Sequence, residues 1–222
     1  MRLIALLALT SLNTYATSLD PEELRVATVE TEQPALLSPL HNTSQQLLTA
    51  LNTQQLSPAQ AGTQLWQQAV AATQQHADDR PLYWNRLWLR RALKQNNIST
   101  EQLAEFEQSS RGIDDIHYHK DSDIRILATG FDPFCLDRYL HQSNPSGLAA
   151  LQLDGQRLTL NGRTAQIETA MIPLRFDDSD QGMIESLFMP YLTQHQVDMV
   201  ITVSMAREQS ALERFPGLNL RV

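Results

Sequence analysis

The chain has 222 residues, 42% of them hydrophobic and 19% charged, which is typical of one or two small globular domains and excludes a disordered or fibrous protein. Its 17 basic and 25 acidic side chains give a formal net charge of −8, which argues against nucleic-acid binding and against a polybasic membrane-surface protein. One cysteine cannot close an intramolecular disulfide, and no cysteine–histidine cluster has structural-zinc spacing, so a disulfide-stapled miniprotein and a zinc module are excluded.

The N-terminus has the pattern of a secretory signal. Arg2 precedes an apolar run from residue 3 to residue 12, and Thr14-Tyr15-Ala16 offers a small residue before a cleavage site. A buried N-terminal strand or helix is the alternative. We predict that residues 1–16 are removed and that the mature protein is periplasmic or secreted. No later segment is apolar enough to span a bilayer, so we expect no membrane association after removal.

The next part of the chain is predicted to be a tether followed by helices. Residues 17–42 hold three prolines and little periodicity, which favours a tether with one helical turn at most. Residues 43–119 have helical spacing of apolar residues and form a predicted accessory region. Helices are expected to start at Ser57-Pro58, at Asp79-Arg80-Pro81 and at the capping-box pattern of residues 99–102, the last helix ending at Gly112.

Four aromatic side chains gather in this helical region, and they have two interpretations. Their rings could stack on a ligand, or they could be core side chains of a small helical subdomain. Helical spacing favours the core. The four are Trp66, Tyr83, Trp84 and Trp88.

A polar boundary follows at residues 113–122. His117 and His119 would share one face of a strand beside several aspartates, which is acceptable geometry for a metal site. A polar linker with two solvated histidines is the commoner arrangement, and we predict neither a metal nor a cofactor.

From residue 123 onward the pattern is that of an α/β domain. A short apolar strand, residues 124–128, precedes a helix that begins at Asn144-Pro145-Ser146. Asn161-Gly162 links residues 158–160 and 165–172 as a hairpin, and residues 177–192 form a predicted helix. The near-continuous apolar run 197–203 suits a parallel strand buried on both faces. We predict an α/β fold with a parallel-rich mixed sheet flanked by helices in three layers, preceded by a small all-α region.

The sharpest local feature is the segment Thr129–Phe134, placed where the first strand ends. Loops at the carboxyl ends of parallel strands are where α/β folds build their sites. Pro133 stiffens the loop, so Phe131 and Phe134 project at a fixed spacing and can enclose a flat, neutral ring. The alternative is that both rings only close the end of the core.

Several motifs occur in one order with this loop. They are Gly130-Phe131-Asp132-Pro133-Phe134, Asn144-Pro145-Ser146, Asp154-Gly155, Ile172–Phe176, Val197–Val203 and Leu212-Glu213-Arg214. Together they resemble the first half of the pyroglutamyl peptidase I family, over residues 123–222. The upstream 122 residues have no counterpart in that resemblance.

The resemblance implies a cysteine peptidase that removes N-terminal pyroglutamyl residues through a Cys-His pair oriented by a glutamate. Glu213 matches the catalytic glutamate, and Phe131 and Phe134 match the aromatic walls of the pocket. The implied partner is a peptide with an N-terminal pyroglutamate, and a homo-oligomer is left open. Considered alone, Glu213 would be a surface carboxylate beside Arg214.

The sequence departs from the family in three places. Cys135-Leu136 stands where the family has glycine. Residues 204–209 replace a Gly-Gln-Ala-Gly-Gly-Arg stretch, so the glutamine that helps to bind the substrate amide is unmatched. The nucleophile and histidine of the family lie beyond the glutamate and have no match among these 222 residues. We therefore expect residues 123–222 to be an incomplete domain that is inactive alone, the alternative being a non-catalytic α/β binding module with an aromatic pocket.

Overall fold

The computed structural model describes residues 18–173, 189–191, 193 and 196–204. The predicted signal (1–16), most of the predicted helix 177–192 and Glu213 lie outside the described residues. The helices and strands are α1 (Pro21–Glu32), η1 (Pro34–Leu37), α2 (His41–Asn52), α3 (Pro58–His76), α4 (Arg80–Gln95), α5 (Thr100–Ser109), η2 (Ile113–Asp115), β1 (Ile124–Phe131), α6 (Pro145–Leu153), β2 (Arg157–Leu160), β3 (Arg163–Ile172) and β4 (Met199–Thr202).

The helices begin where local side chains can satisfy free backbone N–H groups. Ser57 and Ser99 each accept a hydrogen bond from the backbone of the third helical residue, whose glutamine side chain caps in return. The predicted starts of α3 and α5 are therefore confirmed. The predicted end at Gly112 differs, because α5 ends at Ser109 and Gly112 instead begins η2 in the left-handed conformation.

The predicted tether is wrong for most of its length. Pro21 and Pro34 lie in the first turns of α1 and η1, where a missing N–H costs nothing, so these prolines mark helix starts. Val26 and Val29 of α1 are completely buried against α4. Residues 21–37 therefore belong to the packed fold.

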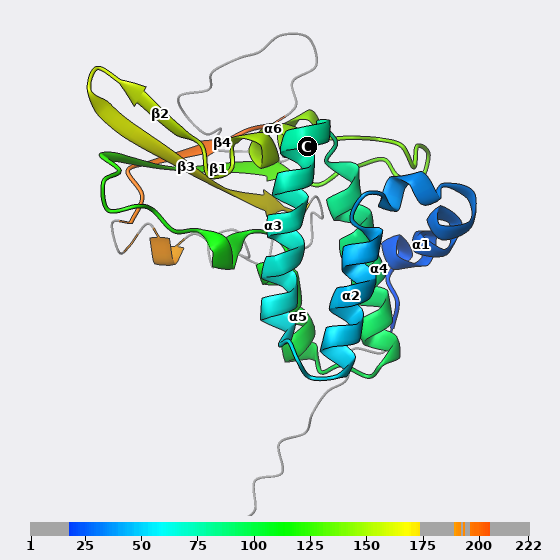
Figure 1. Cartoon of the computed structure of the whole chain (residues 1–222). Helices are drawn as coiled ribbons and strands as arrows, with labels where there is room; N and C mark the ends of the chain where they lie inside the picture. The colour runs from blue at the N-terminus through cyan, green and yellow to red at the C-terminus, as the bar shows by residue number, and fades with distance from the viewer. Residues whose placement is uncertain (1–17, 174–188, 192, 194–195, 205–222) are drawn as a thin grey trace, which may run out of the picture.

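The predicted α/β class is confirmed by a four-stranded sheet of order β2-β3-β1-β4 (Figure 1). Strand β1 is central and pairs in parallel with β3 and β4, whereas β2 and β3 form the predicted antiparallel hairpin. Strand β4 differs from the prediction. It is parallel, but Met199, Val200 and Ile201 are 51%, 43% and 40% exposed, since β4 lies at the edge of the described sheet.

The two faces of the sheet pack against different elements. Met171 of β3 points to the same side as α6, where it joins Ala150 and Leu151. Its neighbours Ala170 and Ile172 point to the opposite side and pack with Ile113, Leu127, Tyr191 and Val197. The described part of the crossover between β3 and β4 therefore lies on the face opposite α6.

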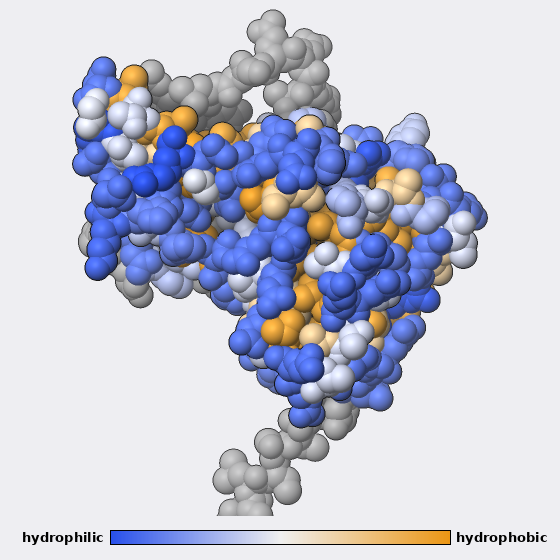
Figure 2. Space-filling model, viewed as in Figure 1, coloured by the Kyte–Doolittle hydropathy of each residue, from blue (hydrophilic) through white to orange (hydrophobic). Residues whose placement is uncertain are grey.

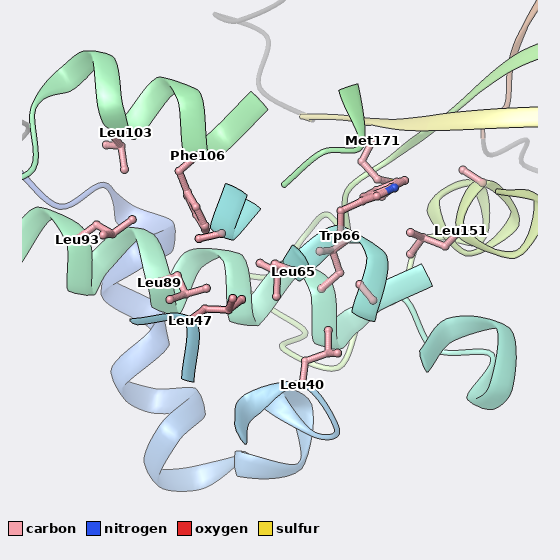
Figure 3. Close-up of a cluster of buried hydrophobic side chains, with 14 residues drawn as sticks. Leu40, Leu47, Leu65, Trp66, Leu89, Leu93, Leu103, Phe106, Leu151 and Met171 are labelled. Carbon is pink, nitrogen blue, oxygen red and sulfur yellow. The ribbon is translucent and has the colours of Figure 1, made fainter. Parts of the chain in front are cut away.

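One hydrophobic core joins the helical region to the sheet. Trp66 of α3, completely buried, belongs to the same cluster as Leu151 of α6 and Met171 of β3 (Figure 3). Trp84 and Tyr83 are also buried, so the prediction that the aromatic side chains are core residues is confirmed for these three, while Trp88 is half-buried. Across the described residues no helix combines the length and apolar character that a membrane span requires.

Gly112 is the residue that allows the helical region to lie this close to the sheet. Its φ is 85°, and a Cβ added there would lie 2.5 Å from Cε2 and Cζ2 of Trp66. Gly155 also has a positive φ, 70°, but an added Cβ meets nothing within 4 Å. Substitution of Gly112 would therefore add both backbone strain and a steric clash, whereas substitution of Gly155 would add backbone strain alone.

We predict that Gly112→Ala lowers the free energy of unfolding by about 3 kcal/mol, since it combines left-handed strain with overpacking against Trp66. Gly155→Ala is the control and should lose about 1 kcal/mol, from strain alone. Urea midpoints of both variants and the parent test this. Equal losses would mean that the contact with Trp66 adds no cost.

Candidate functional site

The candidate site is the loop that follows the central strand. Because β1, β3 and β4 are parallel, their carboxyl ends at Phe131, Ile172 and Thr202 meet at one edge of the sheet (Figure 1). Residues 131–136 leave β1 at this edge. Open α/β sheets bind their ligands at this edge. The loop begins later than predicted, because β1 extends to Phe131 and includes the first three residues of the predicted loop 129–134.

The start of α6 lies directly against the end of β1. The backbone N–H of Phe131 donates to Oγ of Ser146 over 3.2 Å, and Nδ2 of Asn144 donates to the backbone oxygen of Asp132 over 2.9 Å. A Cβ on Gly130 would lie 2.4 Å from the Ser146 oxygen, and one on Gly147 would lie 2.5 Å from the Phe131 oxygen. Glycine at both positions is therefore a condition of this close approach.

The two phenylalanines of the loop are half-buried. Phe131 packs against the cluster of Ile113, Leu127 and Ile172 on the face opposite α6, and Phe134 follows the buried Pro133. The Phe131 ring is thus held by the core, and both rings still present part of their surface to solvent. This is the arrangement expected for side chains that line a binding surface.

Asp132, between the two phenylalanines, is buried with both carboxylate oxygens paired. Nη2 of Arg86 donates to one oxygen, and Nη1 of Arg111 donates to the other over 2.8 Å. Burial alone would raise the pKa of Asp132, but the charges of Arg111 and Arg86 outweigh it and hold this pKa below its usual value. Asp132 is therefore a structural anion and not a general acid or base.

The Asp132 pair is one end of a larger ionic network. Arg111 also donates to Glu107, Arg90 bridges Glu107 and Glu23 at 3.1 Å each, and Glu23 pairs with Lys94 over 2.7 Å. Four carboxylates and four cations take part: Asp20, Glu23, Glu107, Asp132, Arg86, Arg90, Lys94 and Arg111. The formal charges cancel, which is what a largely buried network requires.

Two further contacts fix the loop to the helical region. Leu136 is buried among side chains of α1 and α4. Asp79, which precedes α4, accepts from the Ser143 hydroxyl over 2.5 Å and from the Asn144 backbone over 2.9 Å. The segment from residue 132 to residue 144 is thus held at its two ends and, between them, at Leu136.

Cys135 stands at the exposed turn of the loop. Its φ is 58°, in the left-handed region that favours glycine. Its side chain is exposed and forms no disulfide. The backbone at this position therefore keeps the conformation that glycine adopts most easily.

Two further acidic side chains with raised pKa values lie at the sheet, and no sequence motif indicated a raised pKa for either of them. Burial raises the pKa of Glu168, on β3, to about 7. Burial likewise raises the pKa of Asp154 to about 6, although Asp154 accepts hydrogen bonds from both the backbone and the hydroxyl of Thr169. The sequence offered one signal for these groups, namely an acidic residue within a predicted strand (Glu168) and another at the end of a predicted helix (Asp154).

The two histidines of the boundary do not lie on a strand, which was the arrangement that would have placed them on one face. Nδ1 of His117 lies 2.8 Å from the backbone oxygen of Asp115, and both His117 and His119 are exposed. Gln166 of β3 fixes this segment instead, since it contacts the backbones of both histidines. Within the described ranges, no group of three or more potential metal ligands is found.

Two open grooves lie on the helical region, away from the loop (Figure 2). One, of about 400 Å³, runs between α2 and α3 over Leu47 and Leu56 and is rimmed by glutamines; the other, of about 660 Å³, lies near the Gln54–Ser57 turn. Neither lining includes a titratable side chain, so neither groove offers acid–base chemistry.

Comparison with known proteins identifies relatives without a described activity. A family model described as "PA0049, C-terminal domain" matches residues 125–219, and one described as "PA0049 N-terminal domain" matches residues 9–110. The uncharacterized protein PA0049 of Pseudomonas aeruginosa (strain PAO1) is 33% identical over 190 residues, which cover 70% of this chain and 34% of that protein. The chain thus spans about a third of the length of the curated relative it matches.

No solved structure matches the chain. Since none of the matched descriptions names an activity, the resemblance to pyroglutamyl peptidases stays a prediction.

We predict that Asp132→Asn lowers the free energy of unfolding at pH 7 by about 3 kcal/mol or more, because it leaves two buried cations short of one negative charge. The folded-state pKa of Asp132 lies below its unfolded value of about 4. Its contribution is therefore complete above about pH 5 and is lost as the pH falls below about 4. The variant should have a flatter acid limb in urea midpoints measured from pH 7 to pH 3.

The matched control is Asp121→Asn, which removes an exposed carboxylate paired with Arg157 over 2.8 Å. We expect little change in its midpoint, since exposed pairs contribute about 0–1 kcal/mol. Equal effects of the two substitutions would contradict the role given to the buried pair.

Glu168→Gln should act with the opposite pH dependence. Because the folded-state pKa of about 7 exceeds the unfolded value of about 4.3, the parent loses stability as the pH rises from about 5 to about 7. The glutamine variant should lose less, as shown by melting temperatures at pH 5 and pH 8. Glu101→Gln, at an exposed position of α5, is the control, and identical pH slopes in all three proteins would refute the assignment.

Proposed function

We propose that this chain supplies the substrate-binding wall of a pyroglutamyl-peptidase-type site, with Phe131 and Phe134 enclosing the flat lactam ring of an N-terminal pyroglutamyl residue. The proposal gives binding to residues 131–136 and orientation of the catalytic imidazole to Glu213. The nucleophilic cysteine and the histidine of the family have no match among these 222 residues.

The observation that carries the proposal is the direct contact between the two most specific motifs of the resemblance. The Gly130–Phe134 loop and the Asn144-Pro145-Ser146 helix start are hydrogen-bonded to each other through Ser146 and Asn144. They lie at the carboxyl edge of a parallel sheet, where such folds bind ligands. Two motifs that are separate in the sequence thus form one structural unit.

The backbone of the loop is a second, independent support. Cys135 stands where the family has glycine, and its φ of 58° is a conformation that glycine adopts without strain. A cysteine here is compatible with the family's loop geometry but adds a local cost. Its exposed position in the turn gives it no partner base within the resemblance, so we do not assign it as the nucleophile.

The role proposed for Glu213 follows from cysteine–histidine chemistry. A carboxylate that accepts a hydrogen bond from the imidazole fixes its tautomer and stabilises the imidazolium that stands beside the thiolate. The cysteine is reactive only as the thiolate, so loss of this carboxylate would lower the reactive fraction of the enzyme.

A non-catalytic binding module is the second candidate, and it is favoured by one observation. Asp132 is the titratable side chain at the centre of the loop. Both of its carboxylate oxygens are paired with arginines, so it is not available for proton transfer. Apart from the Cys135 thiol, the described loop therefore offers only apolar surface and backbone groups for binding.

The test is binding of pyroglutamyl-alanine by the 222-residue chain, measured by NMR titration, with prolyl-alanine as the ligand that lacks the lactam carbonyl. A small ligand of this size should bind with a Kd of about 1 mM, which corresponds to about −4 kcal/mol. Phe131→Ala and Phe134→Ala should each weaken binding about tenfold, since each removes one stacking face. No hydrolysis is expected.

The matched control is Tyr139→Ala, which removes an aromatic side chain that is 65% exposed and close to the loop in sequence. It should leave the affinity unchanged. The proposed pocket would be refuted if the chain bound both dipeptides with equal affinity. It would also be refuted if Phe131→Ala and Phe134→Ala both kept the affinity of the parent. Turnover that Cys135→Ala abolishes would show that the nucleophile is misassigned.

A further inference from the structure

The loop of the candidate site is built against a helix that the family resemblance does not include. Helix α4 carries Arg86, which binds the carboxylate of Asp132, and Leu87, which belongs to the cluster around Leu136. Asp79, immediately before α4, binds the far end of the same segment at Asn144. Helix α4 and the residue before it therefore bind both ends of the segment 132–144 and share a hydrophobic cluster with Leu136.

Asp132 is the most restrained residue of this segment. Its backbone N–H donates to the Ile172 oxygen over 3.2 Å, and its backbone oxygen accepts from the Asn144 side chain. Its carboxylate oxygens are held by Arg86 and Arg111. Both backbone groups and both side-chain oxygens are thus fixed in a residue that lies one position after Phe131 and two positions before Phe134.

We propose that Arg86 and Arg111 are positioning residues, which set the place of Phe131 and Phe134 by holding Asp132 between them. The inference rests on the proposed function for its consequence on binding. The effect on the loop itself does not depend on which ligand the loop binds. The helical region is then a part of the site and not an accessory to it.

The chemistry of arginine explains why the role of Arg111 needs a guanidinium. Arg111 donates through Nη1 to Asp132 and through Nε and Nη2 to Glu107, so one planar group bridges two carboxylates. Lysine keeps the charge but offers a single ammonium on a flexible stem, which cannot reproduce this fork. Arginine-to-lysine substitutions therefore keep the charge balance and change mainly the geometry.

The single cysteine of the sequence provides the reporter. Cys135 is exposed and lies in the loop one residue after Phe134, so a nitroxide label attached there reports the order of the loop by electron paramagnetic resonance. Arg86→Lys and Arg111→Lys should make the label more mobile at 25 °C, under conditions where circular dichroism shows folded protein. In the unlabelled variants the affinity for pyroglutamyl-alanine should fall about tenfold.

The matched control is Arg90→Lys. Arg90 belongs to the same ionic network, through Glu107 and Glu23, but makes no contact with Asp132. If the network had only a structural role, all three arginine-to-lysine variants would change label mobility and affinity to the same extent. The proposal expects Arg90→Lys to leave the label and the affinity unchanged, even where its melting temperature falls.

Unchanged label mobility in both Arg86→Lys and Arg111→Lys would overturn the proposal. Increased mobility in a protein whose parent does not bind the dipeptide would support positioning and refute the proposed function instead. Should the variants not fold, hydrogen exchange of the parent decides. The backbone amides of Phe131 and Asp132 should exchange as slowly as those of α4 if Asp132 is held, and exchange as fast as that of the exposed residues 137–139 would overturn the proposal.

Discussion

A buried carboxylate, that of Asp132, joins the helical region to the loop at the end of the central strand. Such a group is tolerated only where its charge and its hydrogen bonds are met, and here two arginines from different elements meet both. Because Arg111 is shared with Glu107, and Glu107 with Arg90, the same requirement extends to α5 and α4. The position of the loop is therefore tied to the packing of the helices.

The network and the hydrophobic core have different roles in this arrangement. Burial of Trp66 with Leu151 and Met171 is a non-directional gain that favours any close packing of the helices on the sheet. Buried ion pairs add little net stability, since desolvation offsets much of their attraction. They are directional, however, so the Arg86–Asp132–Arg111 contacts select one placement among those that the core alone would allow.

Features of the fold that depend on neighbouring residues could be predicted from the sequence. Asn161-Gly162 predicted the hairpin, and Ser57-Pro58 and Ser99 predicted helix starts. The apolar run after Gln196 predicted a parallel strand. The tether was wrong because prolines that begin helices look the same in a sequence as prolines that prevent them. Asp132 could not be recognised as an anchor, since its partners lie 46 and 21 residues away in the chain.

The prediction of the site was limited by the same dependence on distant residues. The sequence located Phe131 and Phe134 at the end of β1, but it treated the helices upstream as separate from the site. Left-handed backbone at Cys135 and a buried charge at Asp132 are both unfavourable in isolation. The contacts with α4 stabilise this loop in one conformation before any ligand arrives. In the proposed function, binding energy from the ligand would then not be needed to order the pocket, and a substrate would meet a preformed aromatic wall.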